Sequence, residues 1–202
     1  MKKLIETLQN IWKIPELRKR ILFTMGILAV YRFGSYVVLP GVVPAALAGN
    51  SNSPADLLGL LNVFTGGAFN NAAVFALGIM PYITASIIIQ LLGFAVPYFQ
   101  RLQQKEGESG RKKLNQITRL LTVAITLVQG AGYLTYIKSQ GAVSAAIPPA
   151  IFWFSNIIIL STGTIFAMWL GERITDRGIG NGVSLLITVG IIATLPLAFV
   201  GE

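Results

Sequence analysis

The chain has 202 residues, of which 53% are hydrophobic and only 12% are charged. Soluble globular domains carry about 25% charged residues, so the composition argues against a water-soluble enzyme and predicts a membrane protein. Cysteine and histidine are both absent. Their absence excludes Cys and His nucleophiles, Ser-His triads, disulfides and zinc sites built on these ligands. The net charge of +8 fits anionic lipid, nucleic acid or membrane topology, so the positions of the charges are informative.

The basic N-terminus, residues 1–20, is predicted to be a cytoplasmic interfacial segment. Its apolar side chains are spaced to form one face of a short helix that lies on the lipid headgroups and ends near Pro15. A helix end that packs on another subunit is the alternative. The face consists of Leu4, Ile5, Leu8, Ile11 and Trp12.

Five apolar stretches are predicted to cross the membrane, because a hydrocarbon core needs roughly 20 apolar residues in a helix. With five spans, the three basic segments fall on one side. The positive-inside rule then places the N-terminus in the cytoplasm and the C-terminus outside. Most of the positive charge therefore sets orientation, and nucleic-acid binding is not expected. The predicted spans are residues 21–39, 72–92, 117–137, 151–170 and 183–199.

The stretch LLGLLNVFTGGAFNNAA, residues 57–73, is apolar, too short to span and interrupted by glycines. Backbone that is not fully helical is tolerated at membrane depth only inside protein or along a cavity. We therefore predict a re-entrant segment that begins with a short apolar piece, Leu57–Phe64. A surface helix at the outer interface is the alternative.

Arg32 lies inside the first predicted span, where a charge costs at least about 2.5–3.5 kcal/mol. One interpretation is that the side chain reaches the outer interface. The other is a buried structural or gating contact. No acidic residue lies in any predicted span, so the partner would be a carbonyl, an amide or another chain.

Several local patterns give further predictions. Pro81 should bend the second span, because proline removes one helical hydrogen bond. The run KEGESGRKK, residues 105–113, should be a mobile loop.

In GERITDRGIGNG, residues 171–182, charges at i, i+4 spacing predict an extra helical turn at the cytoplasmic mouth. RGIGNG is not a phosphate loop. The spans contain no carboxylate pair for a proton relay, so an enzyme is not expected.

Three motifs resemble the SecY family, whose members form the central subunit of the protein-conducting Sec translocon. YRFGSYVVLPG, residues 31–41, resembles the exit of the family's first span. FALGIMPYITASIIIQLL, residues 75–92, followed by KEGESGRKK, resembles the second span and its loop. WLGERITDRGIGNGVSLLI, residues 169–187, resembles a second family signature. The resemblance is to the bacterial form and to its first half only. A piece of a longer protein, a shortened version and a natural half are all compatible with it.

The resemblance implies an all-α membrane protein in which residues 21–202 form one half of an inverted-repeat clamshell. It implies a pore-forming subunit that conducts unfolded polypeptides across, or laterally into, the bacterial inner membrane. A small-solute transporter and a non-conducting membrane assembly subunit are the alternatives. With half a ring and half a gate, the chain alone is not expected to form a sealed channel.

The resemblance also implies residue roles. Branched aliphatic side chains would form a hydrophobic pore ring that seals by excluding water: Ile79, Ile83, Val183 and Ile187. A re-entrant plug-like segment, residues 57–71, would include Leu57, Leu58, Leu60, Leu61, Val63, Phe64, Gly66 and Gly67. The lateral gate would include Thr84, Ser86 and Gln129. Cytoplasmic partner contacts would include Glu108, Arg111, Lys112, Arg173 and Arg177.

The implied partners are SecE-like and SecG-like small membrane subunits, a translocating polypeptide, anionic lipids, and the missing C-terminal half or a second copy. A SecA-type motor ATPase or a ribosome is also implied. These last contacts should be weak, because the family's main docking loops lie in the other half. No cofactor and no metal is expected.

Overall fold

The computed structural model describes residues 13–48, 57–104 and 107–200, and within these ranges every regular element is a helix. Most of the predicted interfacial segment, residues 1–12, lies outside the described residues. The predicted all-α fold class is confirmed. The helices are α2 (Pro15–Gly34), α3 (Pro44–Ala48), α4 (Leu57–Phe64), α5 (Met80–Ala95), α6 (Pro97–Gln104), α7 (Gly107–Ser139), α8 (Pro149–Arg177) and α9 (Gly182–Val200).

Fewer than five of the described helices meet the length and hydropathy expected of a membrane span. Of the described helices, α7 and α8 are each long and apolar enough to cross a membrane. A third span results if α5 and α6, which are bent by 102° relative to each other, count as one broken span. Each of the five predicted ranges contains helix, but the count of five spans is not confirmed.

The second predicted span begins too early. Residues 72–79 form turns, and α5 starts at Met80. The turn backbone bonds to the exit of α2, where the Val74 N–H donates to the Val37 carbonyl at 2.8 Å. Pro81 occupies the first turn of α5, where its missing N–H would have had no helical partner. The prediction that Pro81 bends the span is therefore wrong, and Pro81 begins the helix instead.

Parts of both predicted cytoplasmic loops, residues 105–113 and 171–182, are helical. α7 begins at Gly107, so the described part of the predicted mobile loop, residues 107–113, is helix. On its surface, Lys112 Nζ lies 3.2 Å from Glu108 Oε1, at i, i+4 spacing. α8 continues to Arg177, which confirms the predicted extra helical turn.

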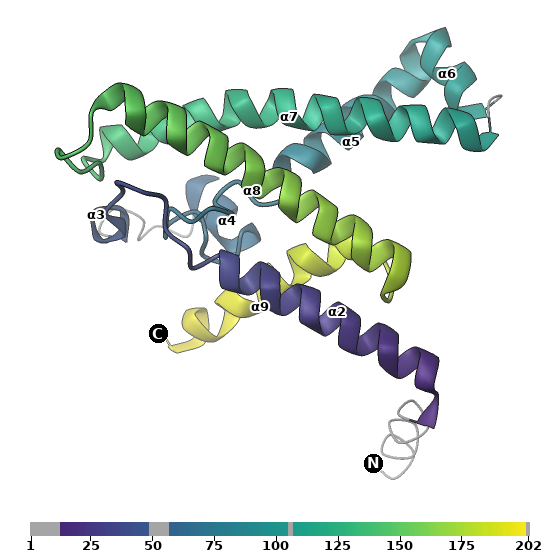
Figure 1. Ribbon diagram of the computed structural model, residues 1–202, viewed down its shortest axis with the longest axis horizontal. Helices are drawn as coiled ribbons and strands as arrows, with labels where there is room; N and C mark the ends of the chain where they lie inside the picture. Colours follow the sequence, from purple (N-terminus) through teal and green to yellow (C-terminus); the bar gives the residue numbers. More distant parts are fainter. Residues whose placement is uncertain (1–12, 49–56, 105–106, 201–202) are drawn as a thin grey trace.

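The helices pack around three apolar clusters. In the view of Figure 1, α8 runs between α7 and α5 on one side and α2 and α9 on the other. One cluster joins α7 and α8 to the segments that follow α2 and α4. A second joins α2, α8, α9 and the residues before α5. The third holds α6 against α5 and α7 through Leu102. α4 packs against α9, so the short apolar helix is placed at the side of the second cluster.

Candidate functional site

The four residues predicted to form a pore ring meet in the second cluster. Ile79 is 3% exposed, whereas Ile83, Val183 and Ile187 are half-buried around it. Gly171 of α8 leaves the room that they fill, since a Cβ there would lie 3.3 Å from Ile79 Cδ1 and 3.5 Å from Val183 Cγ2. The pairs Ile79/Ile83 and Val183/Ile187, from distant parts of the sequence, thus converge in one cluster. Ile79 is the most buried of the four and contacts α8 at Gly171.

The loop between α8 and α9 fixes where α9 begins. Asn181 Oδ1 accepts hydrogen bonds from the N–H groups of Val183, at 3.0 Å, and Ser184, at 3.3 Å. This is the geometry of a helix N-cap. The Ile179 N–H donates to Thr24 Oγ1 of α2 at 3.2 Å. The predicted ring residue Val183 is therefore positioned by a capped helix start whose loop is tied to α2.

Arg32 of α2 bonds to the plug-like segment. Its Nη1 donates to the Gly66 carbonyl at 2.9 Å, and its Nη2 donates to Tyr36 Oη at 3.2 Å. The guanidinium carbon also lies 5.5 Å from the centroid of the Tyr36 ring. The sequence predicted a carbonyl, an amide or another chain as the partner. The structure places a carbonyl there, and that carbonyl belongs to the plug-like segment.

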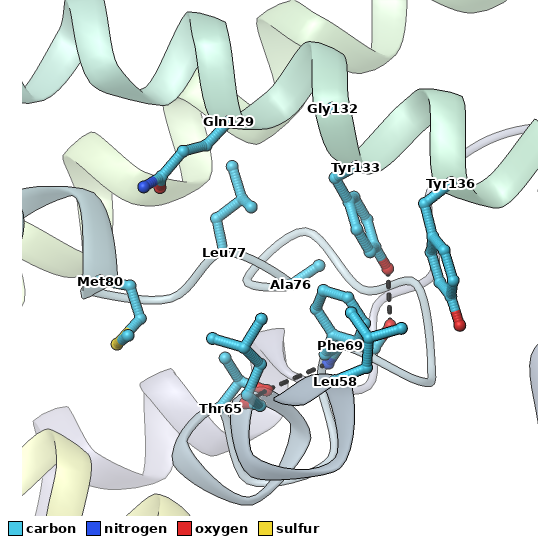
Figure 2. Close-up of a pocket in the computed structure, with 11 residues that line it drawn as sticks. Leu58, Thr65, Phe69, Ala76, Leu77, Met80, Gln129, Gly132, Tyr133 and Tyr136 are labelled. Atoms are coloured by element: carbon cyan, nitrogen blue, oxygen red, sulfur yellow. Dashed lines mark hydrogen bonds between the residues drawn. The ribbon is translucent and has the colours of Figure 1, made fainter. Parts of the chain in front are cut away.

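The turn after α4 is held by its own side chains and by α7. Thr65 Oγ1 accepts the Phe69 N–H at 3.2 Å, and Asn62 Oδ1 accepts the Asn70 N–H at 3.0 Å. Tyr133 of α7 reaches down to donate from its hydroxyl to the Phe69 carbonyl at 2.6 Å (Figure 2). The backbone that follows α4 is thus an ordered turn held by hydrogen bonds from its own side chains and from Tyr133.

The side chains predicted to form the plug are unevenly buried. Leu58, Leu60, Val63 and Phe64 are 38–51% exposed, whereas Leu61 and Gly67 are half-buried and Gly66 is buried. The Leu57 side chain lies outside the described residues. The glycine end of the segment is therefore the part most enclosed by the rest of the chain.

An apolar cavity of about 300 Å³ lies between the plug-like segment, the start of α5 and α7. Figure 2 shows Gln129 and Met80 on one side of it and Tyr133 and Tyr136 on the other. Of the three predicted gate residues, Gln129 lines this cavity. The other two bond inside α5. Thr84 Oγ1 donates to the Met80 carbonyl at 3.0 Å, and Ser86 Oγ accepts from Gln90 Nε2 at 3.3 Å.

The predicted cytoplasmic contact residues occupy two separate helix ends. Glu108, Arg111 and Lys112 are exposed at the start of α7. At the end of α8, Arg177 is exposed, whereas the Arg173 guanidinium lies 5.0 Å from the Trp169 ring centroid and is half-buried. Basic side chains are therefore presented at both helix ends, and Arg173 is the least exposed of them.

Comparison with known protein families identifies the family of this chain. The profile of the SecY family matches residues 73–201. The chain belongs to the SecY family. The predicted resemblance is confirmed over the turn segment and α5 to α9, which contain all four predicted ring residues and all three predicted gate residues.

Individual SecY relatives agree with this assignment. The protein translocase subunit SecY of Escherichia coli (strain K12) is 45% identical over 188 residues, which cover 92% of this chain and 42% of the relative. The corresponding subunit of Streptomyces scabiei is 46% identical over 199 residues, which cover 93% of this chain and 45% of the relative. The chain thus spans less than half the length of these SecY relatives.

Solved structures support the SecY fold. Sec61 in the canine ribosome-channel complex superposes with a TM-score of 0.65 at 22% identity, covering 96% of this chain and 43% of that chain. A structure concerned with the plug domain of a SecY protein gives a TM-score of 0.63 at 22% identity, covering 91% of this chain and 37% of that chain. These likenesses establish the fold of a SecY-type half.

Sequence reasoning missed several residues that shape this candidate site. Arg119 and Glu172 pair across α7 and α8, Tyr133 holds the turn after α4, and Gly190 of α9 closely approaches the plug-like segment. Each acts on a partner far away in the sequence, and no local spacing marks such a pair. For Tyr133, the available signal was a tyrosine hydroxyl inside an apolar span, since a buried hydroxyl usually has a partner.

Proposed function

We propose that the chain is the N-terminal half of the pore-forming subunit of a Sec translocon. The subunit conducts unfolded polypeptides across, or laterally into, a bacterial inner membrane, with the N-terminus in the cytoplasm and the C-terminus outside. The observation that carries this proposal is the convergence of two aliphatic pairs, one at the start of α5 and one on α9, beside the plug-like segment.

The pore ring acts as a dry seal. Ile79, Ile83, Val183 and Ile187 present branched aliphatic side chains, and a narrow apolar constriction blocks ions because it excludes water. Such side chains form no directional bonds, so a translocating polypeptide of any sequence passes between them. The seal is therefore independent of the sequence that is conducted.

The plug-like segment closes the pore from the outer side. A solved SecY structure is described as one whose plug domain stabilises the closed state of the translocation channel and maintains a membrane seal. We extend that role to residues 57–71 of this chain. Support comes from the packing of α4 on α9, the helix that carries Val183 and Ile187.

Polypeptides leave sideways through a lateral gate. α5 and α7 form one side of it, with Thr84, Ser86 and Gln129 as its polar groups, and the C-terminal half forms the other. Hydrogen bonds between membrane helices contribute roughly 0.6–2 kcal/mol each, a size that a signal sequence can displace. The position of Gln129 on the cavity beside the plug-like segment supports a link between gate and plug.

The subunit works with partners on both sides of the half. SecE-like and SecG-like small subunits and anionic lipids surround it in the membrane. Glu108, Arg111 and Lys112 on α7, with Arg173 and Arg177 on α8, contact a SecA-type motor ATPase or a ribosome. We expect these contacts to be weak without the docking loops of the C-terminal half. The channel subunit is not itself an enzyme, and the energy comes from the motor.

The test is a chimera in which this chain replaces the matching segment of Escherichia coli SecY. In cells depleted of resident SecY, the chimera should export a reporter that carries a signal sequence. Normal insertion of the chimera without export would contradict the proposal. Uptake of a small solute that is lost in Arg32→Ala or Gln129→Ala would instead favour a transporter.

A further inference from the structure

The plug-like segment is attached to α2 through the turn that follows α4. The side chains of Leu58, Leu60 and Phe64 remain 38–51% exposed, so α4 is only partly enclosed by the rest of the chain. Gly66, by contrast, is buried, and its carbonyl accepts the 2.9 Å hydrogen bond from Arg32. The attachment of the segment to α2 therefore depends on this residue.

The same residue is in close contact with α9. A Cβ at Gly66 would lie 2.9 Å from Gly190 Cα and would also collide with Arg32 Nη1. A Cβ at Gly190 would lie 2.7 Å from the Phe64 carbonyl oxygen. Gly66 also has φ +64°, a region that side-chain-bearing residues seldom adopt. Glycine is thus required on both sides of the contact, by space and at Gly66 also by backbone conformation.

The hydrogen bond to the Gly66 carbonyl stabilises Arg32 more than it would an uncharged side chain. Its charge lies inside the first predicted span, and an unpartnered guanidinium at membrane depth is costly. Among the described residues, the Gly66 carbonyl and the Tyr36 hydroxyl are its hydrogen-bond acceptors. Departure of α4 would leave the Tyr36 hydroxyl and ring as the remaining contacts of the charge, so Arg32 favours the seated segment.

We propose that Arg32, Gly66 and Gly190 form a latch that holds the plug-like segment seated, with Arg32 as its positioning residue. The inference rests on the proposed function of that segment and adds a coupling to it. Gly190 lies three residues after Ile187 on α9, about one helical turn away. A movement of α9 away from α2 that widens the pore ring also separates Gly190 from Gly66, so ring opening and plug release occur together.

The test measures exposure of the plug-like segment directly. The chain contains no cysteine, so Thr65→Cys, at a position that is 2% exposed in the seated segment, gives a single reactive site within it. The chimera with Escherichia coli SecY, freed of other cysteines, is assembled with its partner subunits in cell membranes. A membrane-impermeant maleimide is then added from the outside, and the labelling rate at position 65 reports how often the segment leaves its seat.

Three variants loosen the latch in different ways. Arg32→Gln and Gly190→Ala should each speed labelling roughly tenfold, the change in equilibrium expected from loss of about one charge-assisted hydrogen bond or its equivalent. Arg32→Lys should have a smaller effect, because an ammonium keeps the charge but loses the planar fork. Gly26→Ala is the matched control on α2, because a Cβ there meets nothing within 4 Å.

Labelling rates in Arg32→Gln and Gly190→Ala that equal the Gly26→Ala rate, at equal amounts of membrane protein, would overturn the latch. Gly190→Ala changes no charge, so it remains informative if Arg32→Gln inserts poorly. The readout is independent of transport. A chimera that exports nothing contradicts the proposed function, whereas an exporting chimera with unchanged labelling contradicts the latch alone.

Discussion

Arg119 of α7 and Glu172 of α8 form a bidentate ion pair, with Nη2 to Oε2 at 2.7 Å and Nε to Oε1 at 3.1 Å. Two parallel hydrogen bonds of this kind fix the relative orientation of the helices that carry them. The Arg119 side chain is 52% exposed and that of Glu172 is 25% exposed, so water and salt still weaken the pair.

Glu172→Gln should lower the free energy of unfolding by about 0.5–1 kcal/mol, the upper part of the range for exposed pairs, because the geometry is bidentate. The loss should shrink at high salt. Thermal unfolding of the purified protein in detergent, at two salt concentrations, measures it. Lys112→Gln is the control, because the Lys112–Glu108 pair is 74% and 86% exposed and should contribute less. An equal effect of the two substitutions would contradict the prediction.

Gly163→Ala should destabilise the protein by about 1–3 kcal/mol, the usual cost of overpacking. A Cβ at Gly163 would lie 2.9 Å from Val74 Cγ1 and 3.1 Å from the Val74 carbonyl carbon, so α8 would have to move off the turn before α5. Gly132→Ala, where a Cβ meets nothing within 4 Å, should be neutral or slightly stabilising. Unfolding in denaturant compares the two, and similar losses would show that the close approach at Gly163 is unimportant.

Tyr133→Phe should cost about 1–3 kcal/mol, because the Phe69 carbonyl is left without its buried donor. Tyr136→Phe is the control, since the Tyr136 hydroxyl makes no hydrogen bond among the described residues and Figure 2 shows it pointing away from Phe69. Proteolysis within residues 57–71 should be accelerated in Tyr133→Phe and not in Tyr136→Phe. Equal cleavage of both variants would mean that the hydroxyl does not hold this turn.

Ile83→Asn should raise resting ion conductance in the chimera with Escherichia coli SecY, because a polar side chain allows water into an apolar constriction. Ile87→Asn, on the same helix but 51% exposed, should leave conductance near the unsubstituted level. Val183→Ile should lower the leak by enlarging the smallest member of the ring. Planar-bilayer recordings measure all three. Greater conductance in Ile87→Asn than in Ile83→Asn would place the constriction elsewhere.

Features that depend on residues close together in the sequence were predicted correctly. A short apolar segment, Leu57–Phe64, was predicted because glycines and asparagines interrupt the apolar run after it, and α4 has the same bounds. The charge spacing after Gly171 predicted the extension of α8 to Arg177. Arg32 was predicted to need a carbonyl, an amide or another chain, because no acidic partner was available in the spans.

The errors arose where distant segments decide the structure. Residues 72–79 look like the start of an apolar span. Their backbone is instead hydrogen-bonded to Val37 and Leu39, in the segment that follows α2. KEGESGRKK looks like a loop by composition. In the structure, Leu114 packs in a buried cluster with residues of α5 and α6. This packing stabilises the first turns of α7, which include residues 107–113. The convergence of Ile79 with Val183 also depends on a glycine of α8 that neither local pattern contains.

The unbroken length of α7 has a mechanical consequence. Its 33 residues form a rod about 50 Å long at 1.5 Å per residue, with the exposed Glu108 near one end and the Tyr133 hydroxyl near the other. A flexible loop after Gly107 would absorb a force applied at that end, but a continuous helix transmits it as a tilt. α7 therefore acts as a lever: a force applied at Glu108 is transmitted along the helix to Tyr133. It then acts on the Phe69 carbonyl, which accepts the hydrogen bond from the Tyr133 hydroxyl.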